Sequence, residues 1–183
     1  MPSISDPGED IAKSVRYEGI DIICIPGACA AITALVSSGL PSSSFVFEGF
    51  LPKRQIDREK ILLEISTSEK TTIIYESPKR LKKLLKELFE FCGGEREIIV
   101  ARELTKKFEE HIGDNVNAVV EFFREKDVIG EITIVVKGIK KRDLNLDKCT
   151  LKKDLHDLIN AGLSLSAASK YLAKKNGVKK SEI

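Results

Sequence analysis

The chain has 183 residues, of which 42% are hydrophobic and 32% charged, proportions typical of a soluble globular protein. No apolar run approaches the roughly 20 residues that a membrane helix needs, and the N-terminus lacks the basic and apolar regions of a secretory signal. The four cysteines form no CxxC pair, which argues against zinc and fits a reducing cytoplasm. Trp is absent and aromatic residues make up 6%, which argues against base stacking on exposed rings.

The chain opens with MPSISDPGED, a polar stretch that reads as a tight loop and could add almost nothing to a core. IDIICIPG, 20–27, predicts a buried strand that its Pro-Gly pair ends. ACAAITALVSSG, 28–39, predicts a helix of small residues closed by glycine. SFVFEGF, 44–50, predicts a strand, and DREKILLEIS, 57–66, predicts a helix.

TTIIYE, 71–76, is a β-branched run that predicts the next strand. SPKRLKKLLKELFEF, 77–91, predicts a helix with serine as its N-cap and proline at the first helical position. REIIVA, 96–101, predicts a strand, 115–126 a helix, and EITIVVKG, 131–138, a last strand. Strands that alternate with helices in this way predict an α/β domain around a central sheet.

The stretch after the last predicted strand breaks this alternation. GIKKRDLNLDKCT, 138–150, reads as a linker, and LKKDLHDLINAG and LSAASKYLAKK predict two short helices. Ala173, Gly177 and Ile183 have the small–glycine–apolar spacing of a helix-turn-helix, a spacing that any pair of short packed helices also produces.

Charge is distributed unevenly along the chain. The part up to Lys137 has 19 basic and 23 acidic residues, a net charge of −4, whereas the part from Gly138 has 11 basic and 5 acidic residues, a net charge of +6. The basic end is either a solvated charged surface or a tail that contacts a phosphate backbone.

The first strand-to-helix turn has the form strand–PGACA–helix. Its small residues would let a ligand approach a helix N-terminus closely, or would let the helix pack tightly on its sheet. The GxGxxG and Walker A patterns are absent, so neither of the common nucleotide-binding motifs applies.

Polar side chains gather at three places next to predicted strands: YESPKR, ARELTKKFEE and the Gly-Glu pair that enters the last strand. Ligands of open α/β sheets bind outside the carboxyl ends of the strands, so Glu76, Arg102 and Glu103 could converge on one cleft. The alternative is that they are surface charges or a structural ion pair. His111 reads as a loop residue and His156 as a solvent-facing one, without partners for catalysis or metal binding.

The order of motifs carries a resemblance. SDPG, PGACAAITALVSSGLP, FVFEGFLPKR, IIYESPKRL, VARELTKKFEE, GEITIVVKG and KKNGVKKSEI follow one another along the whole chain. Together they resemble the ribosomal RNA small-subunit methyltransferase I family of the tetrapyrrole methylase superfamily. EGFLP, YESP and ARELTK are specific to that branch, whereas PGxxA is shared with corrin-ring and diphthine methylases.

The resemblance implies an α/β fold of two subdomains with a cofactor cleft between them. Residues 1–138 match the second subdomain, with a mixed central sheet flanked by helices, and 139–183 match a linker and a small basic helical domain. SISDPG matches the second half of a longer family loop. The resemblance therefore implies that a leading subdomain is missing before Met1 and that this chain is inactive alone.

The resemblance also implies an activity. The family transfers a methyl group from S-adenosylmethionine to the ribose 2′-hydroxyl of a cytidine in small-subunit (16S) ribosomal RNA. The implied partners are ribosomal RNA or the 30S subunit and a second copy of the chain. The implied location is the cytoplasm, with neither a metal nor a membrane involved.

Site residues follow from matching positions. Positions that match cofactor-binding ones are Met1, Cys29, Ala30, Tyr75, Ala101 and Glu131. Positions expected to contact RNA are Arg80, Arg102, Thr105 and Lys106. Two residues depart from the family pattern, because Cys29 stands where serine is more usual and Lys79 where histidine is.

A ribose hydroxyl is a weak nucleophile at neutral pH, so a general base or a hydrogen-bond acceptor should assist it. Glu76 and Glu103 are the catalytic candidates. Two other functions stay open: a small-molecule tetrapyrrole or corrin methylase of the same superfamily, and a non-catalytic RNA-binding module.

Overall fold

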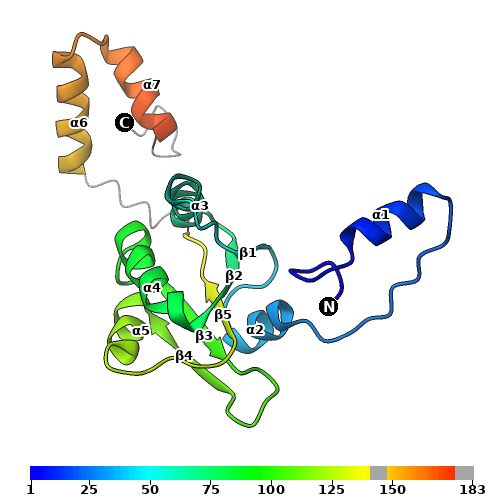
Figure 1. The fold of residues 1–183 in the computed structure, drawn as a ribbon. Helices are drawn as coiled ribbons and strands as arrows, with labels where there is room; N and C mark the ends of the chain where they lie inside the picture. The colour runs from blue at the N-terminus through cyan, green and yellow to red at the C-terminus, as the bar shows by residue number, and fades with distance from the viewer. Residues whose placement is uncertain (141–147, 176–183) are drawn as a thin grey trace. The chain divides into compact units, whose positions relative to one another are not determined.

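The computed structural model describes residues 1–140 and 148–175, and its chain divides into the units Met1–Ile139 and Lys140–Ile183. Figure 1 shows the elements of both units. The helices are α1 (Glu9–Tyr17), α2 (Ala30–Ser38), α3 (Gln55–Thr67), α4 (Pro78–Cys92), α5 (Val116–Phe123), α6 (Lys148–Asn160) and α7 (Leu165–Lys175). The strands are β1 (Phe45–Phe50), β2 (Thr71–Glu76), β3 (Glu97–Arg102), β4 (Glu110–Asn115) and β5 (Ile132–Val136).

The first unit is built on one five-stranded sheet in the order β1-β2-β5-β3-β4. β1 and β2 are parallel, whereas β5 is antiparallel to both of its neighbours, β2 and β3. β2 and β3 therefore run in the same direction and end at the same edge of the sheet, where β5 begins. The predicted mixed α/β sheet is confirmed.

Helices cover both faces of this sheet. α2 packs its small side chains, Ala31 and Ala34, against Ile73, Ala101 and Val135 on one face. α3, α4 and α5 pack on the other face, which Figure 1 shows opposite α2. Because side chains alternate along a strand, β5 supplies both cores from one apolar run.

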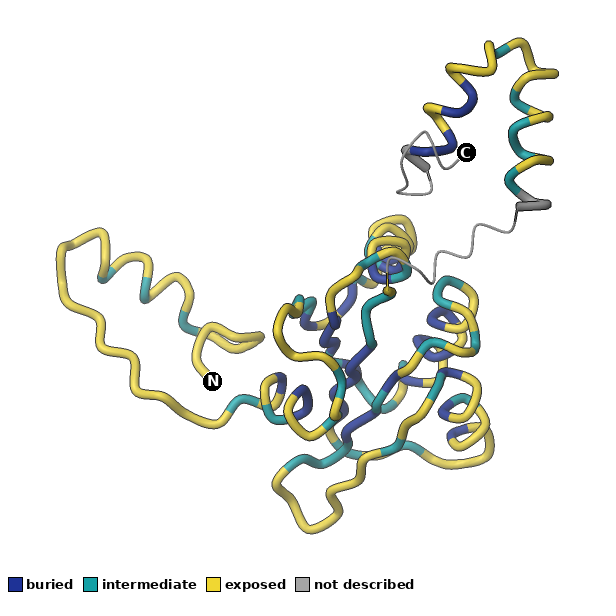
Figure 2. Tube along the Cα trace, turned by 180° about the vertical axis from the view of Figure 1, so that it is seen from behind, coloured by how far each residue is buried: buried dark blue, intermediate teal, exposed yellow. Residues whose placement is uncertain are grey.

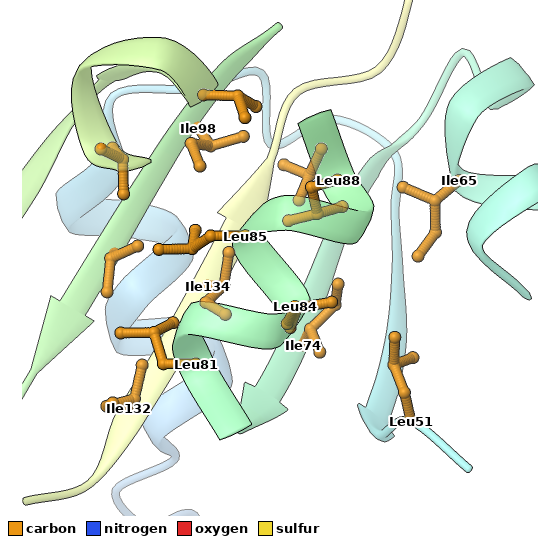
Figure 3. Packing of buried hydrophobic residues seen from close by; sticks show 14 of the residues in the cluster. Leu51, Ile65, Ile74, Leu81, Leu84, Leu85, Leu88, Ile98, Ile132 and Ile134 are labelled. Atoms are coloured by element: carbon orange, nitrogen blue, oxygen red, sulfur yellow. The ribbon is translucent and has the colours of Figure 1, made fainter. Parts of the chain in front are cut away.

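The larger core is centred on α4. Leu81, Leu84, Leu85 and Leu88 lie on one face of this helix and are almost completely buried, next to β5 residues such as Ile134 (Figure 3). Burying a leucine side chain stabilises a fold by about 1.5–3 kcal/mol. The predicted helix, with proline at its first position, is confirmed.

The predicted strand over 20–27 is wrong. This segment has no regular structure, and Ile20, Ile22, Ile23 and Ile25 are 60%, 49%, 87% and 83% exposed. Figure 2 shows it as an exposed stretch between α1 and α2. An apolar run becomes a strand only by pairing with another strand, and none of the strands in the described residues pairs with it.

β4 was not predicted, and the prediction that His111 lies in a loop is wrong. His111 pairs with Ala101 in the antiparallel β3–β4 ladder. EHIGDN lacks the apolar alternation of a half-buried strand because β4 lies at the edge of the sheet. Hydrogen bonds to β3 keep β4 extended. Gly113 allows close packing there, since a Cβ would overlap the Ile99 side chain.

The second unit contains α6 and α7, which the sequence predicted as two short helices. Ala168 and Leu172 of α7 are buried within it. Ala173 lies in α7, whereas Gly177 and Ile183, the other positions of the helix-turn-helix spacing, lie outside the described residues. Across residues 1–140 and 148–175, no helix is long and apolar enough to cross a membrane.

Candidate functional site

A cavity of about 440 Å³ opens at the edge of the sheet where β2 ends and β5 begins. Its walls come from the first loop of the chain, the turn before α2, Phe50, residues 75–78 and residues 130–133. This volume lies within the range of about 300–1,000 Å³ that is usual for small-molecule sites.

The strand register brings the predicted site stretches together. Tyr75 and Ala101 both pair with Thr133, and Glu76 and Arg102 both pair with Ile132. YESPKR, ARELTKKFEE and the Gly-Glu pair therefore meet at one edge of the sheet. That edge is the carboxyl end of β2 and β3, where ligands of α/β sheets usually bind.

Tyr75 joins the cavity wall to the start of α2. Its hydroxyl accepts a hydrogen bond from the Ala31 N–H at 3.0 Å, which satisfies one of the unpaired donors of the helix N-terminus. Its ring makes edge contacts with Phe47 and Phe50, at centroid distances of 4.9 and 5.8 Å. Burial, helped by the nearby Cys29, raises the pKa of the Tyr75 phenol.

Glu76, a residue of the cavity wall, belongs to a buried ionic cluster. Its Oε1 accepts hydrogen bonds from the Arg80 guanidinium at 2.7 Å and the Ser77 N–H at 2.8 Å, and its Oε2 lies 3.5 Å from Arg58. Arg58 also binds Glu87 at 2.7 Å. Glu76 and Arg58 are only 2% and 3% exposed, so the cluster joins α3, β2 and α4 inside the fold.

A second ionic cluster holds the loop after β3. Glu103 has a left-handed backbone, with φ of 54°, and its Oε1 accepts hydrogen bonds from Lys106 Nζ at 2.9 Å and the Glu131 N–H at 2.8 Å. Lys106 Nζ also lies 3.0 Å from Glu131 Oε2. The hydrogen bond from Lys106 lowers the pKa of Glu103, and the same contact raises the pKa of Lys106.

Arg102 and Glu109, near the two ends of this loop, are also paired. Arg102 donates from Nη2 and Nε to Glu110 Oε2, at 2.7 and 3.0 Å. The Thr105 N–H donates to Glu109 Oε2 at 2.7 Å, and Glu109 Oε1 lies 2.9 Å from His111 Nε2. Two predicted RNA-binding cations, Arg102 and Lys106, are thus held by carboxylates here.

The predicted residues differ in their access to the cavity. Those in its wall are Met1, Cys29, Ala30, Tyr75, Glu76 and Glu131. Ala101 is completely buried beneath α2, Glu103 lies on the loop outside the wall, and Arg80 is partly exposed beside Glu76. Sequence reasoning missed Phe50 and Thr133, although a lone polar residue in ITIVV was a signal for the latter.

This fold is shared with a class of solved methyltransferase structures. The chain is similar to the solved structure of the methyltransferase CobJ, with a TM-score of 0.55 and 18% identity over 75% of this chain and 61% of that one. It is also similar to a cobalamin biosynthetic enzyme, cobalt precorrin-4 methyltransferase, with a TM-score of 0.52 and 16% identity over 70% of this chain and 56% of that one. At these identities the likeness shows the fold alone.

The family model of the tetrapyrrole (corrin/porphyrin) methylases matches residues 1–119, and the chain belongs to this family. It is 39% identical to ribosomal RNA small subunit methyltransferase I of Synechocystis sp. over 95% of this chain and 63% of that protein. It is 36% identical to the protein of the same name from Bacillus subtilis, over 100% of this chain and 64% of that protein. The chain thus spans less than two thirds of the length of these relatives.

Proposed function

We propose that the chain provides one side of a methyltransferase site that acts on the ribose 2′-hydroxyl of a cytidine in small-subunit ribosomal RNA, with S-adenosylmethionine as methyl donor. The observation that carries this proposal is the juxtaposition of two features. A cavity of cofactor size opens at the strand ends, and the ARELTKKFEE loop, whose Lys106 binds the wall residue Glu131, borders it.

The residues of the cavity fit an adenosine-containing cofactor. Phe50, Tyr75 and Ile132 provide apolar surface, and Thr133 and Ser77 add hydroxyl groups. The turn at Cys29 and Ala30 brings main chain to the wall, with no large side chain in the way. When bound, S-adenosylmethionine supplies an activated methyl group on a sulfonium.

The residues of this chain would then orient the nucleophile. Glu103 sits on the loop after β3, and its Oε1 is taken by Lys106 and the Glu131 N–H, so its other carboxylate oxygen would accept a hydrogen bond from the ribose hydroxyl. Glu76 is buried and its oxygens already face Arg58, Arg80 and the Ser77 N–H. We therefore assign Glu76 the role of positioning Arg80 and the Ser77 turn at the cavity wall.

The cationic residues would hold the RNA backbone. Three cations lie on segments that meet at this edge: Arg80, Arg102 and Lys106. The planar guanidinium of Arg102 can donate two parallel hydrogen bonds to one phosphate. A phosphate would replace the Glu110 carboxylate as the acceptor for Arg102. The basic C-terminal unit would add affinity that depends on salt and not on sequence.

We also propose a cytoplasmic location, since the substrate is ribosomal. We propose further that two copies of the chain form a homodimer. The deciding experiment is deletion of the gene in the organism that encodes the chain, followed by mass spectrometry of nucleosides from its 16S ribosomal RNA. We expect one 2′-O-methylcytidine to disappear and to return with the gene. An unchanged nucleoside profile refutes the proposal, and altered corrins instead would favour a small-molecule methylase.

A further inference from the structure

We propose that Lys107 and Phe108 form a binding site for an unpaired nucleobase and its adjoining phosphate in single-stranded RNA. This inference rests on the proposed function and adds a substrate contact to it. The two residues lie in the loop between β3 and β4, which projects beyond the edge of the sheet (Figure 1).

The loop is held firmly on both sides of this pair. Leu104 packs against the core beneath α2, and Glu103 and Lys106 are bonded to Glu131 and to each other. Main-chain hydrogen bonds from the Lys106 N–H to the Glu103 carbonyl at 3.0 Å, and from the Glu109 N–H to the Lys106 carbonyl at 3.2 Å, close two turns. A residue between these anchors is therefore presented in a fixed place.

Phe108 is 65% exposed at this position. The Lys107 ammonium lies 5.6 Å from the centre of its ring. Within residues 1–140, the loop cations Arg102 and Lys106 have carboxylate partners, whereas Lys107 has none. The loop therefore offers one aromatic face and one cation that its own acidic residues do not neutralise.

These two groups match the chemistry of a nucleotide. Every base has a π-face that can stack on an aromatic ring, and recognition of single-stranded RNA commonly uses such rings. The phosphate next to that base supplies the anion for Lys107. An apolar protein surface would instead cover the ammonium without a counter-charge, at a cost in desolvation.

The position of the pair fits a nucleotide beside the reacting one. Lys106, the residue before the pair, contacts Glu131 in the cavity wall. A base stacked on Phe108 would therefore lie next to the cavity and not inside it. The pair would fix the register of the RNA strand while its neighbour enters the site.

The test measures the affinity of the 183-residue chain for a short single-stranded RNA that carries fluorescent 2-aminopurine. We expect Phe108→Leu, which keeps apolar bulk but removes the ring, to weaken binding about tenfold and to abolish the stacking-induced change in fluorescence. Phe108→Trp should retain both. Phe89→Leu, at a phenylalanine of α4 that is 48% exposed, is the matched control and should change neither.

Lys107→Gln should lower the slope of log affinity against log salt concentration by about 0.7, the value for one phosphate on a single strand. The inference is overturned if Phe108→Leu binds like the unchanged chain, or if the unchanged chain binds no single-stranded RNA. Loss of the ribosomal methyl group on gene deletion, with Phe108→Leu unaffected in binding, would refute this site alone. If gene deletion leaves the ribosomal methyl group in place and Phe108→Leu weakens RNA binding, the proposed reaction is refuted and the binding site stands.

Discussion

The Tyr75 hydroxyl accepts a hydrogen bond from the Ala31 N–H at 3.0 Å, and this contact joins the end of β2 to the first turn of α2. It crosses 44 residues of sequence. A side chain from the sheet thus satisfies a helix donor that a serine or aspartate at position 29 would ordinarily satisfy.

We expect Tyr75→Phe to lower the free energy of unfolding by about 0.5–1.5 kcal/mol, because the Ala31 N–H loses its acceptor while the ring contacts remain. Chemical denaturation measures this loss. Tyr17→Phe, at a residue that is 89% exposed, is the control and should leave stability unchanged. Equal stability of the two variants would mean that water replaces the phenol without cost.

Arg58 holds two buried carboxylates, those of Glu76 and Glu87. Removing one partner of a buried ionic cluster leaves uncompensated charge inside the fold, so Arg58→Leu should cost about 3–5 kcal/mol of unfolding free energy. Arg54 lies four residues earlier, and its side chain is 74% exposed. Arg54→Leu should therefore change the free energy of unfolding by less than about 0.5 kcal/mol. Similar denaturation midpoints for both would contradict a buried cluster.

Gly130 has φ of +95°, and a Cβ there would lie 2.6 Å from the Glu103 carboxyl group. We expect Gly130→Ala to displace Glu103 and to break its hydrogen bond with the Glu131 N–H. Gly19→Ala is the matched control, since Gly19 also has positive φ, +71°, but open space around it. NMR should show a shifted Glu131 amide signal in the first variant only, and an unshifted signal there would exclude the clash.

The loop after β3 should lose order in acid. Contacts with Lys106 hold the folded-state pKa of Glu103 below its ordinary 4.5, and His111 does the same for Glu109. Their stabilising effect is complete above about pH 4.5 and is lost as pH falls through the lowered values. The pKa of Lys106 is raised above 10.5, so its contribution persists up to that pH and is lost above it.

Amide proton shifts of Glu131 and Thr105, which donate to Glu103 and Glu109, report this titration by NMR. Both should titrate with midpoints below pH 4.5. In Glu103→Gln the Glu131 signal should no longer titrate with that carboxyl, whereas the Thr105 signal should be unaffected. Midpoints at or above the ordinary value would show that the carboxylates are not held ionised by these contacts.

We expect Arg102→Ala to lower ribosomal RNA methylation far more than it lowers affinity for S-adenosylmethionine, because Arg102 lies on the loop side of the site. Calorimetry measures the affinity, and the 2′-O-methylcytidine content of cells carrying the variant measures the reaction. Arg54→Ala, at an exposed arginine of the same unit, is the control. An equal loss of affinity for S-adenosylmethionine and of methylation would contradict the assignment of Arg102 to RNA binding.

Elements with strong local patterns could be predicted from the sequence. The leucine periodicity of α4 and the β-branched run of β2 are both present where expected, because each buries its apolar face against the sheet. The segment at 20–25 has an equally strong pattern but lacks a pairing strand among the described residues, and pairing is not encoded locally. β4 is the opposite case. Its only apolar side chain is that of Ile112, and its hydrogen-bonded pairing with β3 makes it a strand.

The site was predictable only in part. The convergence of Glu76 and Arg102 followed from their positions after strands, and the shared register with Ile132 explains it. The burial of Arg58 could not be predicted, because α3 contains many charged residues and nothing in the sequence marks one of them as buried. Its partner Glu87 also lies 29 residues away in the sequence. The hydrogen bond from the Glu131 N–H to the Glu103 carboxylate likewise joins residues that only the strand order brings near.

β5 lies between β2 and β3, although it is the last strand of the sheet in the chain. During synthesis, the β1–β2 and β3–β4 pairs therefore emerge from the ribosome before the strand that joins them into one sheet. They can join only after residues 132–136 have left the exit tunnel, and β2 must then pair with a strand far along the chain, which slows folding. The last strand to be made thus completes both the sheet and the cavity wall.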